Sequence, residues 1–130
     1  MNRPTIVIDK WQGNICTEEE YVAPNPVQID EGIESLDQRN RTLLIVNVGE
    51  SHLAVGGGGD AFIVYLTYDN SRFFNLVDYA RSGAQVAVNA GGQVGKFAPC
   101  RVVSKEASKK AARWFLQTGI AHPGMTWEPG

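Results

Sequence analysis

Short segments in which apolar and polar positions alternate predict β-strands along most of the chain. Thr5–Ile8 is β-branched, and Gly13 and Asn14 should end this first strand. In Ala61–Tyr68 both alternating faces are largely apolar, which indicates a central strand that is covered on both sides. The same reasoning predicts further strands at Thr42–Val48, His52–Val55, Arg72–Val77, Gln85–Asn89 and Cys100–Val103. Because their connections are short, with glycine-rich turns at 49–51 and 56–60, we expect an antiparallel sheet.

The clearest helix is predicted between Ser104, a favoured N-terminal cap, and Gly119, which is typical of a helix C-terminus. Its apolar side is formed by Ala107, Ala111, Trp114, Phe115 and Thr118. Its opposite side carries the bases Lys105, Lys109 and Arg113. Leu116 falls among these bases, and we expect it to be either an exposed leucine or a contact for a partner.

A shorter helix is predicted where Ile29, Ile33 and Leu36 recur at helical spacing. Two starts are possible. Asn25 could be the cap, with Pro26 in the first turn and Gln28 completing a capping box. Alternatively Asp30 is the cap and the residues before it are extended.

The remaining segments show neither the alternation typical of a strand nor the helical spacing of apolar residues. Cys16–Val27, which contains three consecutive glutamates and two prolines, is predicted to be mostly loop. Ala121–Gly130 has no helical pattern. The sequence therefore predicts an α+β fold, a mainly antiparallel sheet with two helices, as a single domain spanning residues 1–130.

Charge is unevenly distributed along the chain, although the net charge is only −2. Residues 1–40 hold eight acidic and three basic residues, whereas residues 101–130 hold five basic and two acidic residues. The acidic first part indicates attraction to a basic partner. For any single carboxylate, a solvated surface position is the alternative. The sequence pI of about 5.6 argues against a nucleic-acid-binding protein.

We find no pattern typical of a catalytic, cofactor or metal site, and we expect no enzyme and no cofactor. The run Gly56–Gly59 lacks the Gly-Lys-Ser/Thr of a phosphate-binding loop and leads into a strand. His52 and His122 lie far apart and show no ligand spacing with the two cysteines. We expect Cys16 and Cys100 to be reduced, buried thiols.

No apolar run is long enough for a membrane span, and the first residues lack the features of a signal peptide. We therefore expect a cytoplasmic protein without membrane contact.

The second half of the chain resembles a known family. Gly91-Gly92-Gln93, Pro99, Val102-Val103, Ala111–Phe115 and Thr126-Trp127-Glu128 are similar to a family of bacterial immunity proteins, as are Gly56–Gly59 and the apolar stretches after it. The likeness covers roughly residues 40–128. The members of that family are encoded beside polymorphic toxins of the deaminase type, including those that act on cytosine in double-stranded DNA.

The resemblance implies a protein that neutralises a cognate toxin in interbacterial competition by covering its active site or substrate groove. It carries over no catalytic residue. It implies a heterodimer with the toxin and no nucleic-acid ligand, and we expect a monomer when the chain is free. Combined with the charge pattern, it gives as candidate interface residues Trp11, Glu18, Glu19, Glu20, Tyr21, Glu31, Glu34 and Asp60.

Two other functions remain open from the sequence. A small-molecule-binding or catalytic module could use the concave face of the sheet, in which case a titratable residue such as His52 should lie in a deep pocket with a shifted pKa. A nucleic-acid-binding module could instead use the basic helix face at 105–113.

Overall fold

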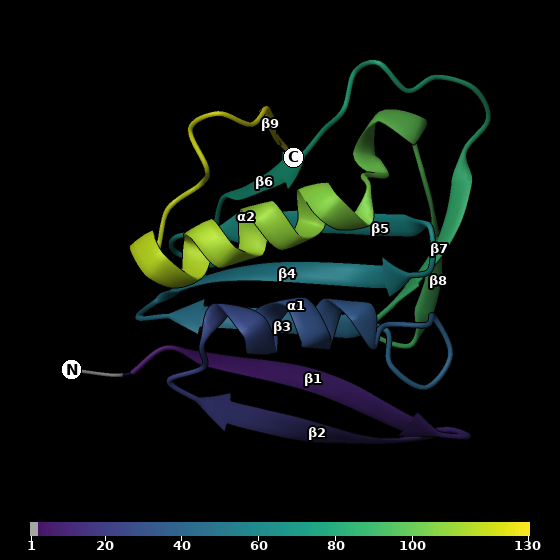
Figure 1. Ribbon diagram of the computed structural model, residues 1–130. Coiled ribbons are helices and arrows are strands. Elements are labelled where there is room, and N and C mark those ends of the chain that lie inside the picture. Colours follow the sequence, from purple (N-terminus) through teal and green to yellow (C-terminus); the bar gives the residue numbers. More distant parts are fainter. Residues whose placement is uncertain (1–2) are drawn as a thin grey trace.

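Alternating apolar residues along the chain build one large antiparallel sheet with both helices on the same side (Figure 1). The computed structural model describes residues 3–130. The strands of the large sheet are β1 (Thr5–Gln12), β2 (Ile15–Val22), β3 (Leu43–Val48), β4 (Ser51–Gly58), β5 (Ala61–Thr67), β6 (Phe73–Leu76) and β9 (Trp127–Pro129). Their order is β2-β1-β3-β4-β5-β6-β9, so β3 to β6 form a meander, β1 lies between β2 and β3, and the C-terminal strand forms the edge beside β6.

The helices α1 (Pro26–Glu34) and α2 (Lys105–Thr118) begin and end where local chemistry specifies. The side chain of Asn25 accepts a hydrogen bond from the Gln28 N–H, and the Gln28 side chain accepts from the Asn25 N–H. This capping box confirms the first of the two predicted starts. Ser104 caps α2, and Gly119 ends it at a φ of 71°.

The core lies between the helices and one face of the sheet. Ile29 and Ile33 of α1 and Phe115 of α2 are fully buried against strand residues such as Phe62. Gly32 brings α1 close to the sheet, because a Cβ at this position would lie 2.6 Å from Leu44 Cδ1. The opposite face of the sheet, called the open face below, is covered by neither α1 nor α2.

A separate hairpin covers one end of the open face. It consists of β7 (Val86–Ala90) and β8 (Gln93–Phe97), joined by Gly91 and Gly92. A Cβ on Gly56 would lie 2.5 Å from Ala90 Cβ, so strand β4 and the hairpin are in close contact. Residues 98–104 then lead back to α2 through a short 3₁₀ helix, η1 (Pro99–Arg101).

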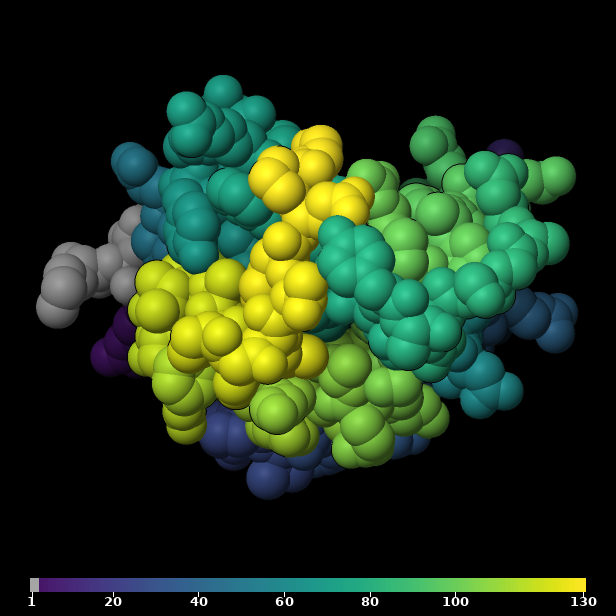
Figure 2. Space-filling view, turned by 90° about the horizontal axis from the view of Figure 1, so that it is seen from above, coloured from purple at the N-terminus to yellow at the C-terminus, as the bar shows by residue number. Residues whose placement is uncertain are grey.

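The C-terminal segment completes the other end of the sheet. In Figure 2 it crosses the surface between the loop near residue 70 and the segment near residue 80. The Val77 N–H donates to the Thr126 carbonyl at 3.0 Å, and β9 pairs with β6. The indole Nε1 of Trp127 donates to the His122 carbonyl at 3.2 Å, so this tryptophan holds the segment in place.

Four sequence predictions for the strands are wrong in part. Cys16–Val27 is not mostly loop, because β2 occupies most of it. The first strand continues to Gln12, and β4 runs through Gly56 to Gly58, so only Gly59 and Asp60 form the turn. The segment predicted as a strand at Cys100–Val103 begins in η1, because Pro99 fixes the first turn, and pairs with the sheet through a single bridge between Val103 and Phe62. The strand β8 before it was missed. Neither β2 nor β8 contains a buried residue, so both strands lack the alternation of buried and exposed positions by which a strand is usually predicted.

Two predictions about burial are also wrong. Leu116 is buried, since α2 contacts α1 as well as the sheet and its apolar surface is therefore wider than one stripe. Cys16 is exposed on β2, and Cys100 is half-buried; both thiols are free.

Candidate functional site

The glutamates of β2 point to both sides of the sheet. The register pairs Glu19 with Ile8, whose side chain is in the core, so Glu19 lies on the helix side. Glu18 is paired with Asp9 and Glu20 with Val7, so both lie on the open face. The three consecutive acidic residues therefore do not form one surface.

On the helix side, β2 and α1 enclose a groove of about 410 Å³ that contains two of the candidate residues, Tyr21 and Glu31. The Tyr21 hydroxyl donates to Glu19 Oε2 at 3.0 Å, and the Arg41 guanidinium also binds Glu19. These two contacts, the tyrosine first, lower the pKa of the Glu19 carboxyl. Glu19 thus stays charged, but Arg41 already compensates its charge.

Glu34 points away from this groove toward α2. Its carboxylate binds Lys109 Nζ at 2.6 Å and Lys105 Nζ at 3.1 Å, and these contacts lower its pKa. One turn earlier, Asp30 binds Arg113 at 2.6 Å. The acidic and basic parts of the sequence therefore neutralise each other where the two helices meet. The basic face that favoured a nucleic-acid-binding module is used for these internal pairs.

Three candidate carboxylates keep their charge free. Among residues 3–130, Glu18, Glu20 and Glu31 form neither an ion pair nor a side-chain hydrogen bond, and all three are exposed. We call these three residues the acidic edge: Glu18 and Glu20 lie in the outermost strand with their side chains on the open face, and Glu31 lies in α1, in the groove beside Tyr21 on the helix side. Ile15 and Val22 are exposed on the same strand, by 65% and 57%, which adds apolar area beside the charges.

The other two candidates lie elsewhere. Trp11 is half-buried in β1, where its indole Nε1 donates to Asp9 Oδ2 at 2.8 Å. Its ring lies against Gly92, since a Cβ there would be 2.2 Å from the indole. Asp60 is exposed in the turn between β4 and β5, and β1 and β3 separate β4 from β2. Asp60 therefore lies away from the acidic edge, whereas Trp11 is paired with Cys16 of β2, two residues from Glu18.

The open face of the sheet is partly apolar. Val7, Ile45, Ala54 and Tyr65 are paired in succession across β1, β3, β4 and β5, and all but the buried Ala54 are half-buried. Beside them, under the β7–β8 hairpin, lies a hollow of about 500 Å³ whose walls include Ile63 and Phe97. This is the surface that a small-molecule-binding module would use.

His52, the titratable residue proposed for that alternative, lies on the same face. Its ring meets Tyr65 edge-on with centroids 6.3 Å apart, and it borders a shallow hollow formed by the β3–β4 turn and Asp69. His122 instead packs on Trp114 of α2, with centroids 4.9 Å apart. The two histidines lie on opposite sides of the sheet and do not form a joint site.

We expect His52 to make the stability of the protein depend on pH. Burial lowers the pKa of its imidazole below the ordinary 6.5, so the unfolded chain takes up the proton first as the pH falls. The free energy of unfolding should therefore decrease from pH 6.5 down through the pKa of the folded state. Denaturant unfolding across this range measures the effect. His52→Gln should remove this part of the decrease, and an unchanged pH profile in that variant would contradict the assignment.

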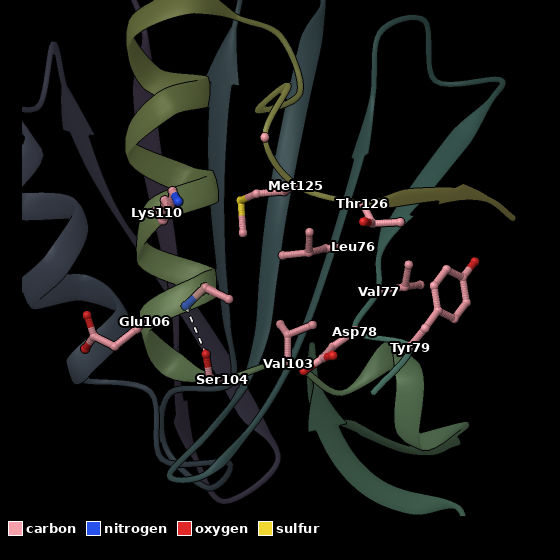
Figure 3. Close-up of a pocket in the computed structure, with 12 residues that line it drawn as sticks. Leu76, Val77, Asp78, Tyr79, Val103, Ser104, Glu106, Lys110, Met125 and Thr126 are labelled. Atoms are coloured by element: carbon pink, nitrogen blue, oxygen red, sulfur yellow. Dashed lines mark hydrogen bonds between the residues drawn. The ribbon is translucent and has the colours of Figure 1, made fainter. Parts of the chain in front are cut away.

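A further cavity, of about 500 Å³, lies between α2, the segment after β6 and the C-terminal loop (Figure 3). Leu76, Val103 and Met125 form its apolar wall. Glu106 and Lys110 lie along its α2 side, and Asp78 and Tyr79 lie across from them. This cavity could not be predicted from the sequence, because its walls come from three segments that are distant in the chain.

Groups of three or more metal-ligating side chains are absent from residues 3–130. Neither helix in that part of the chain has the length and apolar content that a membrane-spanning helix needs.

A comparison with models of known protein families identifies the family of this chain. The family model described as Immunity protein Imm1 matches residues 17–129, which includes almost all of β2 and every element after it. No curated protein matches the chain. The matched region contains the acidic edge, the hairpin on the open face and both helices. Since the match spans most of the chain, the protein belongs to the Imm1 family of immunity proteins.

Proposed function

We propose that this immunity protein binds and inhibits a cognate nucleic-acid deaminase toxin as a one-to-one complex in the cytoplasm, and that the acidic edge faces the toxin. The Imm1 match over residues 17–129 is the observation that carries the proposal, because immunity proteins act against a toxin. The deaminase class is supported by the resemblance of residues 40–128 to immunity proteins encoded beside such toxins.

The charge distribution supports the choice of surface. An enzyme that acts on nucleic acid presents a basic substrate groove, because the phosphate backbone is negatively charged. Glu18, Glu20 and Glu31 offer uncompensated negative charge at one side of the molecule, whereas Glu19 and Glu34 are paired internally. Complementary potentials accelerate association and orient the encounter. Covering the groove would exclude the substrate without any reaction by the immunity protein.

Tyr21 and Val22 add aromatic and apolar contact area, which provides binding free energy that charge alone does not. Nanomolar protection requires about −12 kcal/mol of binding free energy. Exposed aromatic and apolar side chains near the centre of an interface supply most of such energy. Tyr21 and Val22 follow Glu20 in β2 and are exposed by 37% and 57%; Val22 lies on the open face with Glu20, and Tyr21 lies on the helix side in the groove with Glu31.

The test is charge reversal at the acidic edge. We expect Glu18→Lys/Glu20→Lys/Glu31→Lys to lower the association rate with the toxin encoded by the adjacent gene by about 10- to 100-fold at low salt. The difference should shrink as salt is added. Stopped-flow mixing measures the rate, and deamination of a DNA substrate measures protection.

A matched control reverses charges elsewhere. Glu50 and Glu106 are exposed acidic residues in the β3–β4 turn and on α2, so Glu50→Lys/Glu106→Lys tests whether the position matters. We expect a much smaller effect from this pair. Equal association rates for the wild type and the acidic-edge variant would show that another face binds the toxin. A toxin that stays fully active in excess wild-type protein would refute the proposed function itself.

A further inference from the structure

The large sheet ends at β2 with an unpaired backbone edge. In residues 3–130 this eight-residue strand pairs only with β1. The Ala23 N–H donates to the Pro4 carbonyl at 2.7 Å, which fixes the phase of the antiparallel hydrogen bonds. In an antiparallel pair, every second residue of a strand forms backbone hydrogen bonds to a given neighbouring strand. The backbone groups that bond to β1 are therefore those of Ile15, Thr17, Glu19 and Tyr21. The backbone N–H and C=O groups of Cys16, Glu18, Glu20 and Val22 point outward, away from the sheet.

The opposite edge of the sheet is different. β9 has three residues and ends at Pro129, which has no N–H to donate. Within β9, the carboxylate of Glu128 already forms an ion pair with Arg101 at 3.2 Å. Of the two edges, β2 alone offers a run of outward hydrogen-bonding groups, and in Figure 1 it borders the sheet along the full length of β1. Such an edge is a template for another strand.

The side chains at the outward positions select what can pair there. Glu18 and Glu20 belong to these positions, are exposed and have no ionic partner in the described part of the chain. An antiparallel second copy of β2 would place Glu18 of one copy beside Glu20 of the other, and like charges directly opposite destabilise a strand pair. A basic strand would instead form opposite-charge pairs at both positions. On the helix side, Glu19 is already bound by Arg41 and needs no further base.

We propose that the toxin contributes an extended segment that adds to β2 as an eighth strand of the sheet, with lysine or arginine at alternate positions opposite Glu18 and Glu20. This inference rests on the proposed function and specifies how the partner is held. Backbone hydrogen bonds to the outward groups provide affinity, and the two glutamates provide selectivity and register. The intervening side chains of the added strand lie on the helix side, beside Glu19 and Tyr21.

Amide hydrogen exchange on the wild-type protein tests the pairing directly. In the free protein the N–H groups of Glu18, Glu20 and Val22 should exchange fast, and those of Thr17, Glu19 and Tyr21 should be protected by β1. On binding the toxin encoded by the adjacent gene, we expect the outward amides to become protected by at least about tenfold. Residue-resolved NMR of the labelled immunity protein in the complex measures both states.

Proline substitution separates the backbone contribution from the charge. Glu20→Pro removes the outward N–H and the carboxylate, whereas Glu20→Gln removes only the charge and serves as the matched control. An outward N–H is not used by β1, so proline there should be tolerated by the fold, which thermal unfolding checks. We expect the toxin affinity of Glu20→Pro to be at least about tenfold lower than that of Glu20→Gln.

The possible outcomes are distinct. If the toxin is bound and inhibited while the outward amides of β2 stay unprotected, strand addition is overturned and the proposed function stands. Equal affinities of a folded Glu20→Pro and of Glu20→Gln also overturn it. If the wild-type protein neither binds nor inhibits the toxin, the proposed function fails and strand addition fails with it.

Discussion

Replacing Asp9 with alanine is expected to destabilise the protein by about 3–4 kcal/mol, because several buried donors would lose their acceptor at once. Asp9 is 7% exposed, and its carboxylate accepts hydrogen bonds from Thr42 N at 2.7 Å and from Leu43 N at 2.9 Å. The Thr42 hydroxyl and the Trp11 indole donate to it as well. Denaturant unfolding of the variant measures the loss.

The same substitution should loosen the β7–β8 hairpin. The Thr42 hydroxyl accepts a hydrogen bond from Gly92 N at 3.0 Å, and Trp11 lies against Gly92, so Asp9 orients both contacts of the hairpin tip. We expect faster amide exchange at Gly92 than in the wild type. Asp60→Ala, at an exposed carboxylate of the β4–β5 turn, is the control and should change stability by less than about 0.5 kcal/mol. A loss of less than about 1 kcal/mol in Asp9→Ala would show that water replaces the carboxylate.

Gly58→Ala is expected to cost about 3 kcal/mol or more, because the backbone leaves no space for a methyl group. Gly58 has a φ of +151°, and a Cβ would lie 2.5 Å from the Leu36 carbonyl oxygen and 2.6 Å from Asp37 N. These are backbone atoms of the segment that follows α1, so relief requires the segment to move. Thermal and denaturant unfolding measure the effect.

The neighbouring Gly59 provides the matched control. Its φ is +66°, but nothing lies within 4 Å of a Cβ at this position. Gly59→Ala should therefore cost only the left-handed backbone strain, about 1–2 kcal/mol. If both alanine variants were equally stable, backbone conformation rather than close contact would explain the glycines of this run.

The glycine run shows how far the sequence leads and where it stops. Its lack of a phosphate-loop pattern was evident from the residues, and a turn was expected throughout 56–60. In the structure Gly56, Gly57 and Gly58 are buried parts of β4. They are glycines because other segments approach closely, namely Ala90 of the hairpin, Ala61 of the next strand and Leu36 after α1. Such tertiary contacts leave no local signal.

Helix ends, by contrast, could be predicted because their chemistry is local. The Ser104 and Gly119 caps were predicted from the sequence, and the Asn25–Gln28 capping box was one of the two starts that the sequence offered for the first helix. β2 could not be predicted in the same way. Seven of its eight residues are exposed, so its pairing depends on backbone bonds to β1 and leaves no apolar alternation to detect.

The candidate site was predicted as a set of residues but not as a surface. The sequence placed the acidic residues in the first 40 positions, yet their use depends on partners that are distant in the chain. Glu34 is bound by lysines 71 and 75 residues away, and Glu19 by an arginine 22 residues away. Once β2 is recognised as a strand, the alternation separates Glu18 and Glu20 from Glu19. Glu19, on the helix side, is bound by Arg41, whereas Glu18 and Glu20, on the open face, have no ionic partner in the described residues.

The inequality between the two edges of the sheet limits how far this chain can assemble. Growth of a filament requires each subunit to offer two complementary ends, one for the subunit before it and one for the subunit after it. Here one end is the eight-residue β2, and the other is the three-residue β9 with its proline. A partner strand that adds to β2, as we propose, would therefore find no equivalent edge at β9 on which the same pairing could be repeated.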